Sequence, residues 1–170
     1  MKIAEQWEVL NESRKTLPVD VFALPKKLGI ELNLACLGNT VSGMIEKSGE
    51  AFTLTVNALD PKPRQRFTIA HELGHYMLHR YLIGDGLDDD RVYRSTDVGK
   101  YHNTRVGLKQ EREANRFAAN LLMPREAAND HHKTGASIEN IAEKFGVSKH
   151  TMFICLGLKH TVKTALTRPV

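Results

Sequence analysis

Five consecutive residues place two imidazoles and a carboxylate at a spacing that suits metal chemistry. His71-Glu72-Leu73-Gly74-His75 is an H-E-x-x-H motif within a segment of helical periodicity. In a helix, His71 and His75 stand one turn apart on the same face, close enough to bind one metal ion. Glu72 points to a neighbouring face, where it can accept a proton from a water molecule that the metal activates. The motif therefore predicts metal-assisted hydrolysis of a peptide bond, with His71 and His75 as ligands and Glu72 as the catalytic base.

A hydrolytic zinc site usually has three protein ligands and a fourth position for water, so another ligand must be found. His79 continues the i+4 series, but it lies about 12 Å from His71 along a helix that rises ~1.5 Å per residue. Because a metal–nitrogen bond is only ~2 Å long, these two histidines cannot bind the same ion. We therefore expect His79 to serve in packing or helix capping.

A second strong helix, predicted over residues 108–123, offers two carboxylates. Glu111 shares a face with Asn115, so Glu111 could bind the metal while Asn115 orients a histidine ring. Glu113 lies about 200° around the helix from Glu111, beside Phe117. This geometry favours Glu111 as the third ligand and leaves Glu113 as the alternative.

A small sheet is predicted ahead of the metal-binding segment, because apolar and polar residues alternate there. The predicted strands are 30–34, 41–46 and 51–57, and Ser48-Gly49 joins the last two as a hairpin. We also expect that the strand 51–57 can bind an extended substrate as an added strand at a sheet edge.

Helices make up the rest of the predicted scaffold. Ile3, Trp7 and Leu10 predict a first helix, and residues 19–28 predict a second, which Pro25 kinks or shortens. The H-E-x-x-H motif lies on a central helix over about 64–81. We expect the apolar stripe of this helix to lie in the core. Its residues are Phe67, Ala70, Leu73, Gly74, Met77 and Leu78.

Two stretches together resemble a known family. HELGHYMLH (71–79) and EREANRFAANLLMP (111–124) are similar to the motifs of ImmA/IrrE metallopeptidases. The resemblance covers roughly residues 18–160. It implies that His71 and His75 bind the metal, that Glu72 is the general base, and that Glu111, in the E-x-x-A-[N/D] position, is the third ligand.

The resemblance also implies a fold and a function. We predict an α+β, zincin-like fold: a small, mostly antiparallel sheet packed with helices, H-E-x-x-H on the central helix, and a helical C-terminal region. Residues 1–128 are predicted to form the metallopeptidase domain and 129–170 a helical extension packed on it. The expected activity is zinc-dependent cleavage of one cytoplasmic protein, a helix-turn-helix repressor of a phage, mobile element or stress response. Mn²⁺ and Fe²⁺ also suit two imidazoles and a carboxylate.

Composition sets the expected location and partners. Of the residues, 41% are hydrophobic and 26% charged, a normal globular mixture, and the net charge of +4 comes from scattered rather than clustered cations. No apolar stretch has the length of a membrane span or the form of a signal core, so no membrane contact is expected. Cys36 and Cys155 are predicted to be buried free thiols, which favours a cytoplasmic protein.

A rival function comes from residues 137–158, which resemble a helix-turn-helix around Gly146-Val147-Ser148. The second predicted helix of this pair is apolar all round, whereas a recognition helix needs a polar face, so direct nucleic-acid binding is disfavoured. A metal-binding regulator that no longer cleaves is the other alternative, because its residues would look the same.

A peptidase also needs a hydrogen-bond donor for the developing oxyanion, besides the metal. The sequence does not distinguish among the candidates, which are Tyr93, Tyr101, His102, His131 and His132.

Overall fold

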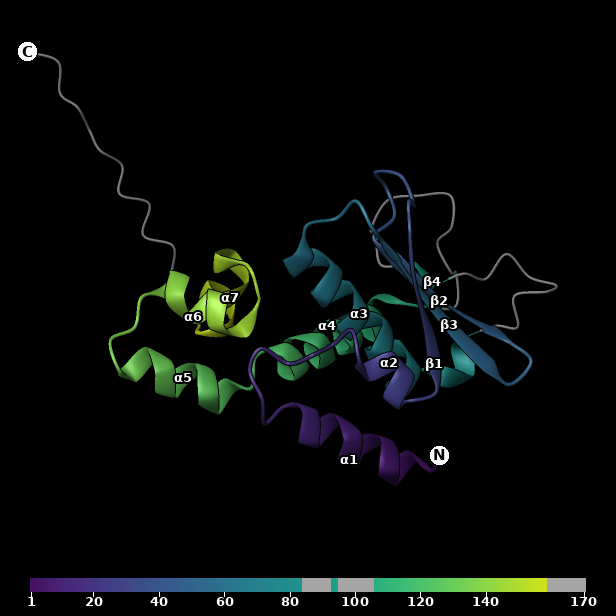
Figure 1. The fold of residues 1–170 in the computed structure, drawn as a ribbon, viewed down its shortest axis with the longest axis horizontal. Coiled ribbons are helices and arrows are strands. Elements are labelled where there is room, and N and C mark those ends of the chain that lie inside the picture. The colour runs from purple at the N-terminus through teal and green to yellow at the C-terminus, as the bar shows by residue number, and fades with distance from the viewer. Residues whose placement is uncertain (84–92, 95–105, 159–170) are drawn as a thin grey trace, which may run out of the picture.

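The structure, a computed structural model, describes residues 1–83, 93–94 and 106–158. Within these ranges the chain forms one mixed sheet and several helices, so the predicted α+β class is confirmed (Figure 1). The elements are α1 (Ile3–Ser13), α2 (Leu24–Lys27), β1 (Ile30–Ala35), β2 (Gly43–Ser48), β3 (Ala51–Asn57), α3 (Lys62–Leu78), the 3₁₀ turn η1 (Arg80–Leu82), β4 (Tyr93–Arg94), α4 (Leu108–Leu122), α5 (Arg125–Lys133), α6 (Ile138–Phe145) and α7 (Lys149–Cys155). No helix in the described part of the chain is long and apolar enough to cross a membrane.

The strand order is β1-β3-β2-β4. β2 and β3 form the predicted hairpin, with Gly49 at a φ of 57° in its turn, and β4 also pairs antiparallel with β2. β1, however, pairs parallel with β3, so the sheet is mixed. Because β3 is hydrogen-bonded on both sides, it has no open edge. The expectation that 51–57 binds substrate as an added strand is therefore wrong.

α3 lies between the sheet and α4, while α5, α6 and α7 gather beyond α4 at the end away from the sheet (Figure 1). Ile69, Ala70 and Leu73 are fully buried, as are Leu54 and other side chains on the inner face of the sheet. Covered on two sides, α3 is buried around most of its circumference beyond its first turn. The buried residues include the polar Gln65, Thr68, His71, Glu72 and His75. The helix ends at Leu78, earlier than predicted, so Leu78 is 39% exposed rather than in the core.

The N-terminal helices differ from the predicted pattern. Ile3 is 65% and Trp7 37% exposed, and the buried positions of α1 are Gln6 and Leu10. The Gln6 side chain is held inside because its amide donates to the Tyr76 hydroxyl (3.1 Å) and its oxygen accepts from Arg80 (2.8 Å). The periodicity of apolar residues cannot predict the burial of a polar residue whose hydrogen-bond partners lie far away in the sequence.

The second helix is shorter than the predicted range 19–28. α2 is only four residues long, and Pro25 lies in its first turn, where its missing N–H costs nothing, rather than kinking it.

The two cysteines are not both buried. Cys36 is exposed, in the connection after β1, and Cys155 is half-buried; both thiols are free. Burial of Cys36 was thus predicted wrongly.

The guanidinium of Arg66 links α3 to the end of α6. α6 begins at the N-cap Ser137 and ends at Gly146 in the left-handed conformation (φ 64°). Arg66 of α3 donates from Nε to the Gly146 carbonyl (2.9 Å) and from Nη2 to the carbonyls of Val19 (2.8 Å) and Phe145 (3.4 Å). Arg66 thus satisfies carbonyls at the end of α6 that have no partner within the helix. The division at residue 128 stays a prediction.

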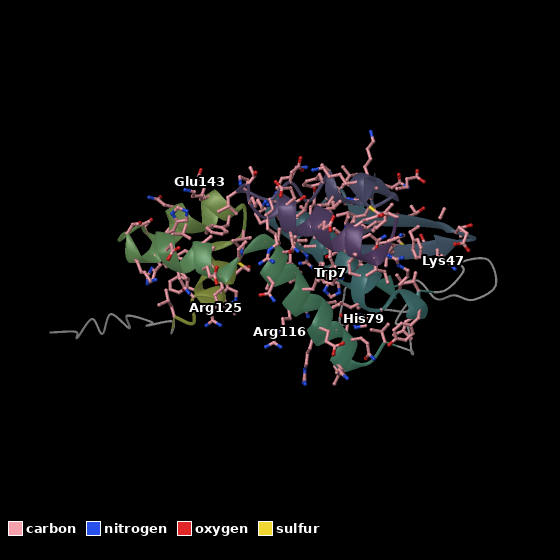
Figure 2. The ribbon with its side chains drawn as sticks, turned by 90° about the horizontal axis from the view of Figure 1, so that it is seen from below. Trp7, Lys47, His79, Arg116, Arg125 and Glu143 are labelled. Carbon is pink, nitrogen blue, oxygen red and sulfur yellow. The ribbon has the colours of Figure 1, made fainter. Side chains whose placement is uncertain are left out.

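Replacing Arg66 with Met tests this attachment. The change keeps an apolar stem but removes the donor to the carbonyls of Gly146 and Phe145, and one of the two donors to Val19, so we expect the free energy of unfolding to fall by about 1–3 kcal/mol. Amide exchange in α6 and α7 should become faster. Arg116→Met on the outer side of α4 is the control, since Arg116 is exposed (Figure 2) and its loss should change stability by less than ~0.5 kcal/mol. Equal stability of the two variants, measured by urea titration, would contradict the role of Arg66.

Candidate metal centre

The site begins with a close crossing of α3 and α4 at Gly74. A Cβ added to Gly74 would lie 3.1 Å from both the Cα and the carbonyl oxygen of Ala114, and 3.2 Å from Cδ1 of Phe117. These contacts are tighter than ordinary van der Waals packing, so only glycine allows the helices to approach this far. The crossing brings the first turns of α4 within reach of the histidines on α3.

Three side chains converge at this crossing. The Nε2 atoms of His71 and His75 lie 3.0 Å apart, and Glu111 places its carboxylate oxygens 3.4 Å from Nε2 of His71 and 3.3 Å from Nε2 of His75. One ligand atom from each of the three residues lies within 4.8 Å of the others. The two imidazoles are almost completely buried and Glu111 is half-buried. The structure thus brings together His71, His75 and Glu111, and leaves Glu113 outside the group.

Asn115 orients the ring of His71. Its Oδ1 lies 3.0 Å from Nδ1 of His71, one turn along α4 from Glu111. An amide oxygen only accepts, so Nδ1 of His71 must carry a proton. In the neutral ring the lone pair of Nε2 then faces His75 and Glu111. The predicted contact between Asn115 and a histidine ring is confirmed.

His79 does not join the three converging residues. It caps the C-terminus of α3, as predicted, and is only 3% exposed. Its Nδ1 lies 3.3 Å from Nδ1 of His75, and its Nε2 lies 2.9 Å from Oε2 of Glu113. Glu113 therefore pairs with His79, on the other side of the α3–α4 crossing from Glu111. This contact was not predicted; the i+4 spacing of the three histidines was the only signal for it.

Burial and charge act in opposite directions on the three groups. Burial would lower the pKa of His71, but the hydrogen bond with Glu111 and the charges of Glu72 and Glu111 raise it above its usual value. Burial lowers the pKa of His75, and the neighbouring histidines lower it further. Burial would raise the pKa of Glu111, yet the two histidines hold it far below its usual range. Glu111 therefore stays a carboxylate.

These donors fit a divalent metal ion. With the proton of His71 on Nδ1, a lone pair of Nε2 and the oxygens of an ionised carboxylate point into one small space, where a cation relieves their mutual repulsion. Two imidazoles and one carboxylate form a common catalytic zinc set that leaves a position for water. Manganese and iron accept the same donors. Glu72, fully buried on α3, is the residue next to His71, and its charge acts on that ring.

Most of the oxyanion candidates are not resolved by this geometry. Tyr101, His102 and the side chain of Tyr93 lie outside the described residues. His131 lies on α5 with its ring 6.0 Å from that of Phe145, and neither it nor His132 belongs to the three-residue cluster. Phe67, predicted only as part of the apolar stripe of the central helix, has its ring centroid 6.4 Å from that of His71.

Comparison with known proteins gives one family and one fold. Residues 25–153 match the peptidase M78 family model, described as the IrrE N-terminal-like domain. A solved structure named Mycobacterium tuberculosis transcriptional regulator is similar with a TM-score of 0.54 and 18% sequence identity, covering 86% of this chain and 42% of that one. The likeness at this identity concerns the fold alone, and the chain spans less than half of that protein. No curated protein sequence matches the chain.

Widening the crossing should weaken the site. Gly74→Val places a branched side chain against the backbone of Ala114, so we expect overpacking to lower the free energy of unfolding by about 1–3 kcal/mol. Because α4 must move, zinc affinity, measured by competition with a chromophoric chelator, should fall about tenfold or more. Asn120→Val adds the same side chain at an exposed position of α4 and should leave zinc affinity unchanged. Wild-type affinity in Gly74→Val would show that the crossing does not position Glu111.

Proposed function

The chain belongs to the family of IrrE N-terminal-like peptidase domains, and we propose that it is a zinc-dependent endopeptidase that cleaves one specific transcriptional repressor in the cytoplasm. The observation that carries this proposal is the convergence of His71, His75 and Glu111 within 4.8 Å beside the buried Glu72. Family membership by itself implies a peptidase domain and a protein substrate. The similarity of both motifs to repressor-cleaving peptidases supports the narrower choice of substrate.

Each residue has a separate task in this proposal. When bound, a divalent metal supplies Lewis-acid activation of the attacking water and of the scissile carbonyl. Glu72 accepts the proton of that water and donates it to the leaving amine. Asn115 holds His71 in the tautomer whose Nε2 lone pair is available. The burial of His71, His75 and Glu72 keeps bulk water away from these side chains. The local dielectric constant is therefore low, and charges at the site interact more strongly than in water.

The cytoplasmic part of the proposal rests on cysteine chemistry. Cys36 is an exposed free thiol, and such a thiol persists best in a reducing compartment.

DNA binding through α6 and α7 has less support. The turn between them has the expected helix-turn-helix sequence, but α7 has only seven residues, and Lys149 is paired with Glu139 of α6. Ile154 is 68% exposed on α7, where base or phosphate contacts would need a polar side chain. This apolar position favours packing against protein over contact with a duplex.

The peptidase proposal is tested with Glu72→Gln. The zinc-loaded wild type and this variant are incubated with the helix-turn-helix repressor encoded nearest to the gene, and fragments are measured by mass spectrometry. We expect Glu72→Gln to bind zinc normally and to cleave about 10²–10⁴-fold more slowly, because the general base is removed and the ligands are kept. Equal cleavage by both proteins would refute the assignment, and no cleavage by either would favour a silent regulator.

The ligand set is tested by metal analysis. His71→Ala and Glu111→Ala each remove one of three donors, and we expect the zinc content after dialysis to fall from one equivalent to near zero. Glu126→Ala, at an exposed position of α5, is the matched control and should retain zinc. Full zinc occupancy in Glu111→Ala would exclude Glu111 as a ligand.

A further inference from the structure

A second pair of side chains stands behind His75, on the side away from Glu111. His79 lies one helical turn after His75, with Nδ1 facing Nδ1 at 3.3 Å. Glu113 reaches from α4 to Nε2 of His79 at 2.9 Å. Figure 2 shows His79 beside α4, the helix that carries Glu113. The metal-binding face of His75 and the contact with His79 therefore lie at opposite nitrogens of one ring.

With both imidazoles neutral, the carboxylate at the end of this series sets which nitrogens carry the protons. A carboxylate only accepts, so Nε2 of His79 carries the proton that bonds to Glu113. A neutral imidazole has one N–H, so Nδ1 of His79 is then an acceptor. Nδ1 of His75 must donate to it, which leaves Nε2 of His75 with a lone pair directed at the three-residue cluster.

The arrangement depends on how α4 crosses α3. Glu111 and Glu113 both precede Ala114, the residue that touches Gly74, and they point to different sides of α4. One carboxylate thus faces Nε2 of His75 (3.3 Å), and the other reaches the same ring through His79. His79 is 3% exposed, so its ring is held by its surroundings, whereas the Glu113 side chain is 43% exposed at the edge.

We propose that His79 and Glu113 are positioning residues that hold the metal ligand His75 in its Nε2-coordinating tautomer and orientation. They do for His75 what Asn115 does for His71, so that both imidazoles are fixed from behind. The inference rests on the metal site of the proposed function and goes beyond it, because neither residue belongs to the three-residue cluster.

Two substitutions of His79 separate positioning from packing. His79→Asn keeps an acceptor oxygen close to where Nδ1 stood, whereas His79→Leu fills space without an acceptor. We expect the dissociation constant for zinc, measured on the full chain with a chromophoric chelator, to rise about 10–100-fold in His79→Leu and less in His79→Asn. The ligand-field absorption of cobalt-loaded protein should shift in His79→Leu. If His79→Leu binds zinc as tightly as wild type, or more tightly than His79→Asn, the residue only packs and the proposal is wrong.

Substitutions of Glu113 test the other end, at a position exposed enough to tolerate change. We expect Glu113→Ala to weaken zinc binding and Glu113→Gln, which keeps an acceptor oxygen, to retain most of it. In the His79→Leu background, Glu113→Ala should have no further effect, since the two residues act through one contact. Lys109→Ala removes the exposed partner of Glu113, 3.9 Å away, and should not change zinc affinity. Additive effects of the two substitutions would contradict action through His79.

The wild-type protein separates this inference from the proposed function. If wild type binds zinc and cleaves the repressor while the His79 and Glu113 variants bind equally well, only the positioning role is overturned. If wild type binds no zinc, both proposals are overturned.

Discussion

The close crossing of α3 and α4 at Gly74 and Ala114 is the constraint on which the rest of the site depends. A side chain at Gly74 would meet backbone atoms of α4 at 3.1 Å, and backbone atoms cannot turn away as the end of a flexible side chain can. His71 and His75 of α3 meet Glu111 of α4 near this crossing. The contacts of Asn115 with His71 and of Glu113 with His79 also join the two helices here. The glycine within the H-E-x-x-H motif is therefore a packing requirement of the second helix rather than a requirement of the chemistry.

The surroundings of α3 make this crossing rigid. The sheet covers one side of the helix and α4 the other, while Arg66 joins its N-terminal half to the end of α6 and to the segment before α2. Burying His71, Glu72 and His75 on such a helix is costly unless each has a partner, and Asn115, Glu111 and His79 supply partners for the two histidines. The polar network is thus part of the core.

Local patterns predicted the parts of the structure that depend on local geometry. The i+4 spacing put His71 and His75 on one face, the alternation in 51–57 gave β3, and the angular positions on the second helix favoured Glu111 over Glu113. Three features could not be reached in this way: the parallel pairing of β1, the burial of Gln6, and the contact between His79 and Glu113. Each is a contact between residues far apart in sequence, and one-dimensional periodicity contains no information about its partner.

The donors His75 and Glu111 come from different helices, separated in sequence by the whole connection between α3 and α4. A metal bound there acts as a reversible cross-link that closes this loop, and it binds the folded chain far better than the unfolded one. By mass action, a free metal concentration 100 times the dissociation constant adds about 2.7 kcal/mol to the stability of the fold. The cellular supply of that metal would then affect how long each folded molecule survives. A fall in supply would lower the amount of folded protein as well as its activity.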